Sequence, residues 1–267
     1  KEVRKDGEAC SLAVRTGGAG DPPLLLLHGF PLTSASYDPV REAVEAVRRV
    51  ITVDLRGFGR SDAPAGPFDM EVLAEDVVRA ADLLGVDRFI LGGHSMGGYV
   101  SFRLAARHPE RLAGLVLIDT RAAPDSPEGV ERRRAGMAEV REGRREAFLE
   151  RMLPSLVAGD RPEVLEMLRA MAATVPDHVL IGCLDAMARR PDSRRLLREL
   201  DIPALVITST EDQLLLPGEP EEMAAELPRG RLEVIPGAGH CPMLDHPEAF
   251  ADALIRFLAD VEPGRRS

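Results

Sequence analysis

The stretch Leu91-Gly92-Gly93-His94-Ser95-Met96-Gly97-Gly98 sets a serine between two glycines, at the point where an apolar run gives way to a helical pattern. This is the Gly-x-Ser-x-Gly pattern of a nucleophile elbow, a sharp strand-to-helix turn that exposes the serine side chain. Gly93 and Gly97 leave room for the neighbouring backbone to close around the turn. The backbone N–H of Met96 would then point toward an oxyanion, with the polarity of the helix N-terminus behind it. The competing interpretation is that small residues only fill a tight turn, and the rest of the chain decides between the two.

Length and composition fit one large α/β domain. The chain has 267 residues, of which 45% are hydrophobic and 29% are charged, and its formal net charge is −10. A chain of this kind can bury a sizeable core. Its acidic balance argues against nucleic acid as a partner, because binding phosphates needs a basic face.

Three cysteines, Cys10, Cys183 and Cys241, lie far apart and lack the spacing of metal or redox motifs. They argue against a disulfide framework and favour a reducing, cytoplasmic setting. We expect no cofactor and no metal ion. No apolar run approaches the roughly 18 residues that a membrane helix needs, and the start, Lys1-Glu2-Val3-Arg4-Lys5, lacks the apolar segment of a secretory signal. We therefore expect no membrane partner.

Short apolar runs alternate with segments of helical periodicity along most of the chain. This alternation is typical of a mostly parallel central sheet flanked by helices, an α/β fold. The expected strands are 24–27, 50–55, 89–92, 115–118, 204–208 and 232–235. The expected helices between them are 39–47, 70–84, 97–107, 220–227 and 247–258.

The alternation stops between about Arg121 and Arg198, where the chain reads as several successive amphipathic helices. We expect an inserted helical cap over 121–198 and an α/β core made of 1–120 and 199–267. Apolar residues recur in the cap at helical spacing in two stripes, which are Phe148, Met152 and Leu156, and then Leu180, Cys183, Leu184 and Met187. The segment holds 15 arginines and 13 acidic residues, so it is slightly positive in a chain of net charge −10.

The run Arg132-Arg133-Arg134 in the cap can be interpreted as an anion site or as a solvated helix face. Flanking Glu128 and Glu131 favour the solvated face. The cap is also rich in methionines, which we expect mainly in core packing, with some lining an apolar substrate pocket. These are Met137, Met152, Met167, Met171 and Met187.

A catalytic serine needs a base, and His240 is the best placed of six histidines. It lies in Pro236-Gly237-Ala238-Gly239-His240-Cys241-Pro242, directly after the last expected strand. Ligands bind outside the carboxyl ends of strands in open α/β sheets, so His240 and Ser95 should share one edge. The side chain of His94 should point away from the cleft if that of Ser95 points into it. The remaining histidines are expected in structural or turn positions: His28, His108, His178 and His246.

The base in turn needs an acid to orient it. Asp212 lies four residues after the expected strand 204–208 and gives the chain order Ser, Asp, His of this elbow type. Glu211 is adjacent, and Asp119 also follows an expected strand, so Asp119 is the serious rival. The acid would fix the histidine tautomer and stabilise the imidazolium that forms.

Together these motifs resemble the α/β-hydrolase fold superfamily with a helical cap, over nearly the whole chain. His28-Gly29-Phe30-Pro31 follows an early strand as the oxyanion loop of that superfamily does, and the resemblance implies that the Phe30 N–H joins the Met96 N–H in an oxyanion hole. Asp54-Leu55-Arg56-Gly57-Phe58-Gly59-Arg60-Ser61-Asp62 is similar to the superfamily's next turn, in which Asp54 and Arg56 look structural. With the elbow around Ser95 and its Asp212 and His240, these make three motifs in the right order, which is strong evidence.

Within the superfamily the chain most resembles small-molecule serine esterases and lactonases, including 3-oxoadipate enol-lactonase-like proteins. A serine at position 95 disfavours haloalkane dehalogenases and epoxide hydrolases, whose nucleophile is a carboxylate. The resemblance implies two-step acyl transfer through Ser95 on a small apolar carboxylic ester or lactone. Two alternatives stay open: a carbon–carbon bond hydrolase with the same triad, and a slow-turnover ligand sensor on the same fold.

Overall fold

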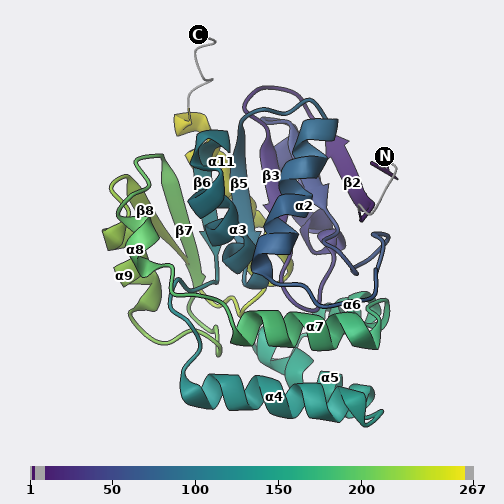
Figure 1. Cartoon of the computed structure of the whole chain (residues 1–267). Helices are drawn as coiled ribbons and strands as arrows, with labels where there is room; N and C mark the ends of the chain where they lie inside the picture. The colour runs from purple at the N-terminus through teal and green to yellow at the C-terminus, as the bar shows by residue number, and fades with distance from the viewer. Residues whose placement is uncertain (1, 4–9, 262–267) are drawn as a thin grey trace.

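A mixed sheet of eight strands forms the centre of the molecule in the computed structural model, which describes residues 2–3 and 10–261 (Figure 1). The strand order is β1-β2-β4-β3-β5-β6-β7-β8. β2 pairs antiparallel with β1 and β4, and all neighbours from β4 to β8 are parallel. The strands are β1 (Glu2–Val3), β2 (Leu12–Gly17), β3 (Leu24–Leu27), β4 (Val50–Val53), β5 (Phe89–His94), β6 (Leu112–Ile118), β7 (Ala204–Ser209) and β8 (Gly230–Ile235).

The central strands are buried on both faces, which explains their continuously apolar sequences. Every residue of β3, β4 and β5 is buried. The register pairs Leu26 with Gly92 and Leu27 with Gly93. As a result, β3 and β5 end side by side, and the loop after β3 meets the turn that holds Ser95.

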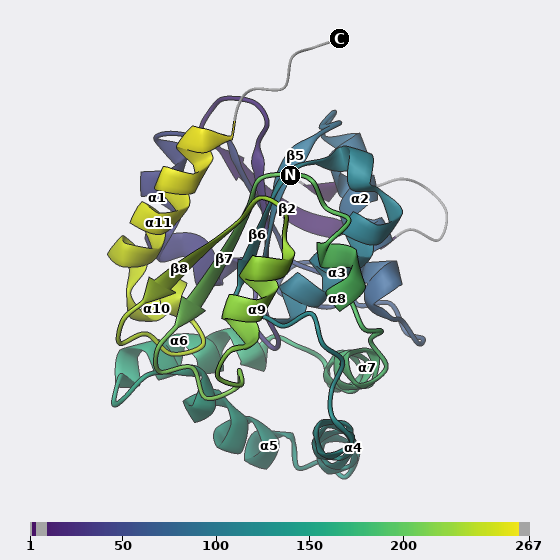
Figure 2. The same ribbon diagram turned by 90° about the vertical axis from the view of Figure 1, so that its left-hand side faces the viewer.

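Helices cover both faces of this sheet (Figure 2). On one face α1 (Asp38–Glu45) packs against α11 (Pro247–Asp260), and on the other α2 (Met70–Leu83) packs against α3 (Met96–Arg107). The Asp69 side chain accepts a hydrogen bond from the Val72 N–H at 2.9 Å and so caps the start of α2. Four short helices lie in the connections: η1 (Ser34–Tyr37), η2 (Pro109–Arg111), α9 (Glu219–Glu226) and α10 (Pro242–Asp245).

The chain between β6 and β7 is helical. It contains α4 (Pro127–Arg141), α5 (Arg145–Met152), η3 (Leu153–Leu156), α6 (Pro162–Ala173), α7 (Asp177–Ala188) and α8 (Arg194–Leu197). Helices α4 to α7 gather at one end of the sheet (Figures 1 and 2). α4 packs on α5 and α7, whereas α8 packs beside α9, next to the sheet. We call 121–198 the helical insert below; its division from the core as a separate cap domain stays a prediction.

The expected fold class, a mostly parallel sheet flanked by helices, is confirmed. All six expected strands and all five expected helices are present, with ends that move by at most three residues. The sequence pattern does not predict the antiparallel strands β1 and β2. β2 is buried only in its first half and contains Arg15, Thr16 and Gly17, so its apolar signal is short.

Candidate active site

Ser95 forms the turn between β5 and α3 in a strained conformation. Its φ is 50° and its ψ is −113°, outside the regions that non-glycine residues normally adopt. The turn is held by a hydrogen bond of 2.9 Å from the Ser95 N–H to the Ile118 carbonyl oxygen. Added Cβ atoms would lie 2.4 Å from the Gly97 oxygen at Gly93, and 2.5 Å from the Leu27 oxygen at Gly97. Only glycine fits at these two positions, so the elbow packs as its sequence predicts.

The loop after β3 packs directly on this elbow. A Cβ at Gly29 would lie 3.1 Å from the Ser95 Cβ. Among the hydrogen bonds found for residues 10–261, none uses the backbone N–H of Phe30 or of Met96 as donor. Phe30 and Ser95 line the same cavity, and Met96 opens α3. Two unpaired N–H groups beside a serine suit the binding of an oxyanion.

His240 and Asp212 form a buried pair at the same edge. His240 Nδ1 lies 2.7 Å from Asp212 Oδ2, and the side chains are 4% and 2% exposed. Burial raises the pKa of Asp212, but the charge and hydrogen bond of His240 outweigh this effect, so its net pKa is lowered. An ionised Asp212 fixes the proton on His240 Nδ1, which leaves Nε2 as the basic nitrogen. Within the described residues, the buried Nε2 has no hydrogen-bond partner, and no hydrogen bond joins it to Ser95. Catalytic hydrogen bonds of this kind are often long without substrate.

Asp119, the rival acid, has a different partner. Its Oδ1 accepts a hydrogen bond from the Ser209 N–H at 3.0 Å, and its Oδ2 accepts one from the Ser209 hydroxyl at 2.8 Å. Burial, and then the charge of neighbouring Asp212, raise the pKa of Asp119 well above its usual value. Ionisation of Asp119 is disfavoured because it would place two buried carboxylates side by side. The geometry pairs Asp212 with His240 and leaves Glu211 exposed.

His94 contacts the loop of His240 from behind. Its Nε2 lies 2.6 Å from the His240 carbonyl oxygen, and the two ring centroids are 5.0 Å apart. Burial, followed by the charge of His240, lowers the pKa of His94 to about 3. His94 is therefore neutral, and its Nε2–H donates to the carbonyl. Its side chain is absent from the residues that line the cavity with Ser95, as expected, but its contact with His240 was not foreseen.

Asp245 links the His240 loop to the helical insert. Its Oδ2 accepts hydrogen bonds from the Gly239 N–H at 2.7 Å and from the Ala158 N–H at 3.2 Å. Arg161 adds a bond of 2.9 Å to the Asp245 carbonyl oxygen and lies 3.0 Å from His246 Nε2. Sequence reasoning missed Asp245, because its partner Ala158 is 87 positions away and no local pattern connects them.

Ser95 and His240 line a cavity of about 250 Å³ whose far wall is the helical insert. Its apolar lining comes from both expected stripes: Phe148, Met152, Leu156, Leu184 and Met187. Met137 and Met171 are buried, but Met167 is 39% exposed, so the expectation of core packing is wrong for Met167. Arg133 is half-buried, lines the cavity and pairs with Asp125, so the solvated-face interpretation is wrong for Arg133.

The turn after β4 is structural. Asp54 accepts hydrogen bonds from the Ser34 N–H at 2.8 Å and the Arg60 N–H at 3.2 Å. Arg56 pairs with Asp76 at 2.7 Å. Neither Asp54 nor Arg56 lines the cavity. Both therefore shape the loops beside the site without facing it.

Residues 2–3 and 10–261 contain no group of three or more His, Cys, Asp or Glu side chains that could hold a metal ion. No single helix in this part of the chain is long and apolar enough to cross a membrane. α6 and α7 together meet the length and composition, but they are bent by 102°. The cytoplasmic setting stays a prediction.

A profile of the family described as alpha/beta hydrolase fold matches residues 22–247. The chain belongs to this family. Among solved structures, this α/β hydrolase is similar to a thermophilic esterase of Thermogutta terrifontis with malate bound (39% identity, TM-score 0.91, covering 98% of both chains). It is also similar to an enol-lactonase of Burkholderia xenovorans (29% identity, TM-score 0.86, covering 94% of this chain and 97% of that one).

Curated relatives of this α/β hydrolase differ in length. A pimeloyl-[acyl-carrier protein] methyl ester esterase of Yersinia enterocolitica is 32% identical over 256 residues, which cover 90% of this chain and 94% of that protein. The polyketide synthase ThaQ of Burkholderia thailandensis is 32% identical over 253 residues, 91% of this chain but only 12% of that protein. The fold therefore occurs both alone and as a small part of a much larger enzyme.

Proposed function

We propose that this α/β hydrolase is a serine hydrolase that cleaves a small-molecule carboxylic ester or lactone through Ser95. The observation that carries the proposal is the buried His240–Asp212 pair, 2.7 Å apart, with an unpaired His240 Nε2 in the cavity lined by Ser95. The free N–H groups of Phe30 and Met96 supply the other requirement, a site for negative charge.

The relatives support the general class, a hydrolase that acts on ester bonds. The proteins that match over nearly the full chain are named as esterases or as an enol-lactonase. We assign 1–120 and 199–267 to the catalytic core and 121–198 to a cap that shapes the substrate pocket. Side chains of α4, α5 and α7 in the cavity wall support this division.

The reaction would proceed in two steps. The Ser95 oxygen attacks the carbonyl carbon while His240 Nε2 takes the serine proton, and the Phe30 and Met96 amides bind the oxyanion. The intermediate collapses, the ester C–O bond breaks, and His240 returns the proton to the leaving alcohol. Water then attacks the acyl-enzyme by the same route, which frees the acid and restores Ser95. With a lactone, the alcohol stays attached to the acyl chain.

The direct test replaces the nucleophile and the base. Ser95→Ala and His240→Ala should each lower kcat for a short p-nitrophenyl ester at least about a thousandfold, because triad members act as a unit. Mass spectrometry should detect one covalent adduct of a fluorophosphonate on wild type and none on Ser95→Ala. Circular dichroism and thermal unfolding check that both variants fold. Turnover at the wild-type level in Ser95→Ala would disprove the proposal.

Assays with several esters and a vinylogous diketone separate the two alternatives, a carbon–carbon bond hydrolase and a ligand sensor. Cleavage of a vinylogous diketone faster than of any ester would identify a carbon–carbon bond hydrolase with this triad. Tight ligand binding with negligible product release would identify a sensor. Ester turnover excludes both alternatives if it depends on Ser95, is faster than cleavage of the diketone and releases product over many cycles.

A further inference from the structure

The cavity that holds Ser95 is positively charged within an acidic protein. Arg121, Arg132 and Arg133 line it, against a single acidic residue of the insert, Asp125. The chain as a whole carries a net charge of −10. A cleft lined by one sign of charge concentrates ligands of the opposite sign. The arginines therefore indicate a negatively charged substrate, which the apolar lining alone does not indicate.

Part of this positive charge belongs to a cluster of ion pairs in the cavity wall. Asp125 is paired with both Arg133 and Arg190, the latter at 2.8 Å, and the Asp125 and Arg190 side chains are only 7% and 4% exposed. Arg190 also stacks over the Tyr99 ring, 4.1 Å from its centroid. Two guanidinium groups share one carboxylate, so the cluster keeps one uncompensated positive charge beside the cavity. Arg121, in contrast, has a partner of its own, Glu219, at 3.6 Å.

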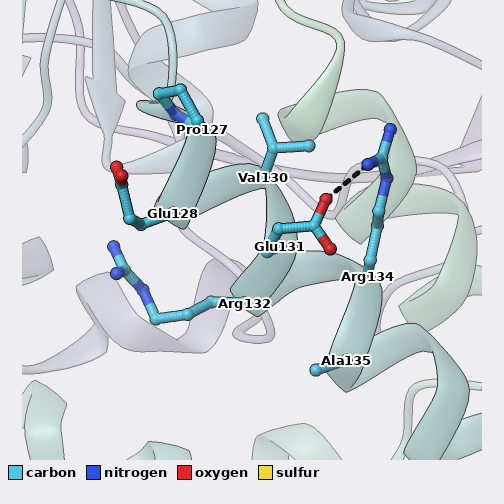
Figure 3. A pocket seen from close by; sticks show the side chains of 7 residues that line it. All are labelled: Pro127, Glu128, Val130, Glu131, Arg132, Arg134 and Ala135. Atoms are coloured by element: carbon cyan, nitrogen blue, oxygen red, sulfur yellow. Dashed lines mark hydrogen bonds and ion pairs between the residues drawn. The ribbon is translucent and has the colours of Figure 1, made fainter.

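Arg132 is the arginine with free donors. Within the described residues it makes no hydrogen bond and no ion pair within 4.0 Å. Glu128, one turn earlier on α4, lies beside it beyond that distance and interacts with it electrostatically (Figure 3). It lines both the Ser95 cavity and the open hollow on the outer side of α4, so it lies at the rim between them. Figure 3 shows that Arg134 turns instead to Glu131, with which it forms an ion pair, and Arg134 does not line the cavity. A guanidinium offers five donors in a planar fork that matches a carboxylate.

We propose that this site selects esters or lactones that carry a carboxylate away from the scissile bond, and that Arg132 binds this carboxylate. The inference rests on the proposed function and replaces the expected small apolar substrate by an anionic one. Phe148, Met152 and Leu156 of the insert give the cavity an apolar wall, and they would contact the methylene groups that join the two ends of the substrate. The fixed Asp125 cluster adds long-range attraction, whereas Arg132 supplies the direct contact.

The test compares two esters of the same diacid. Monomethyl glutarate carries the distal carboxylate, and dimethyl glutarate carries the same chain with a neutral end. Wild type should show a higher kcat/KM for the monomethyl ester, and Arg132→Gln should lower kcat/KM for the monomethyl ester about tenfold more than for the dimethyl ester. Raising the ionic strength should weaken the wild-type preference, since Arg132 is exposed to solvent.

Arg134→Gln is the matched control, because it removes the same charge from the same helix outside the cavity, and it should keep the wild-type preference. Calorimetry of monomethyl glutarate with Ser95→Ala and with Ser95→Ala/Arg132→Gln measures binding without turnover. An equal or lower wild-type kcat/KM for the monomethyl ester overturns the proposed substrate class. A preference that survives in Arg132→Gln, or falls equally in Arg134→Gln, overturns the role of Arg132. Hydrolysis that persists in Ser95→Ala refutes the proposed function instead, independently of these ratios.

Discussion

Two buried carboxyl groups lie close to each other at the edge that carries Ser95 and His240, and their pKa values shift in opposite directions. Asp212 has a lowered pKa because the charge and hydrogen bond of His240 outweigh the effect of burial. Asp119 has a raised pKa because burial and the charge of Asp212 both oppose its ionisation. Only one of the two can act as the anion that orients His240. Identical side chains thus have opposite pKa shifts because their partners differ.

Replacing each carboxyl by the isosteric amide separates these roles. Asp212→Asn should lower kcat by about a thousandfold or more, because an amide no longer holds the productive tautomer of His240. Asp119→Asn should lower it by less than about tenfold, because the amide has the size of the carboxyl group, its oxygen can accept from the Ser209 N–H, and its NH2 can donate to the Ser209 hydroxyl oxygen. Steady-state kinetics on a neutral ester at pH 7 decides, with urea unfolding as the check on folding. Equal losses in the two variants would contradict the assignment of Asp212.

Single residues also mark where sequence reasoning succeeds and fails. The sequence predicts that Ser95, His240 and Asp212 share one edge because each follows an apolar run, and the structure brings the three together there. Their catalytic roles stay predictions. The contact between His94 and His240 spans 146 positions, and no periodicity reports such a distance. In the run 132–134, successive helix positions rotate by about 100°. Arg133 consequently faces Asp125 and Arg134 faces Glu131, although both residues are arginines.

At the scale of elements, the helical insert and the His240 loop are joined by one carboxyl group. Asp245 accepts hydrogen bonds from the N–H groups of Gly239 and Ala158, which belong to the two different segments. Asp245 is 3% exposed, and burial raises its pKa despite both hydrogen bonds. The insert that lines the cavity is therefore connected to the loop that carries His240. Strand and helix patterns predict neither end of this link, since both lie in loops.

Asp245 should act as a positioning residue for His240. Asp245→Ala leaves two buried N–H groups unpaired, at about 1–3 kcal/mol of unfolding free energy each. It should also lower kcat by about ten- to hundredfold with a smaller effect on KM, because the loop that orients His240 loses its anchor. Asp245→Asn should restore most of kcat, since its side-chain oxygen can accept both hydrogen bonds. Urea unfolding and steady-state kinetics measure the two effects.

The exposed Asp252 on α11 provides the control, and Asp252→Ala should match wild type in both measurements. The raised pKa of Asp245 adds a second readout. Wild type should lose stability relative to Asp245→Asn as the pH rises through the native pKa of this carboxyl, because ionisation is costlier in the folded state. A kcat for Asp245→Ala equal to that of Asp252→Ala would show that His240 needs no such anchor.

At the scale of the whole molecule, buried titratable groups from different elements set opposite pH dependences. His28 and His94 are fully buried, and burial lowers the pKa of both. They take up protons on unfolding below about pH 6.5, so their contribution to stability is complete above that pH and is lost as the pH falls. Asp119 and Asp245 have raised pKa values and release protons on unfolding, which opposes the histidines in part of the same range.

Because these contributions overlap, a variant that removes one group is needed to resolve them. His94→Gln keeps a donor for the His240 carbonyl but cannot titrate. Its unfolding free energy should fall less steeply than that of wild type, by about 1.4 kcal/mol per pH unit between roughly pH 6 and 4, because one fewer proton is taken up on unfolding. Urea unfolding over this range measures the difference. His178→Gln, which replaces an exposed histidine of α7, should follow the wild-type curve. Parallel curves for His94→Gln and wild type would mean that His94 is not held neutral behind the catalytic loop.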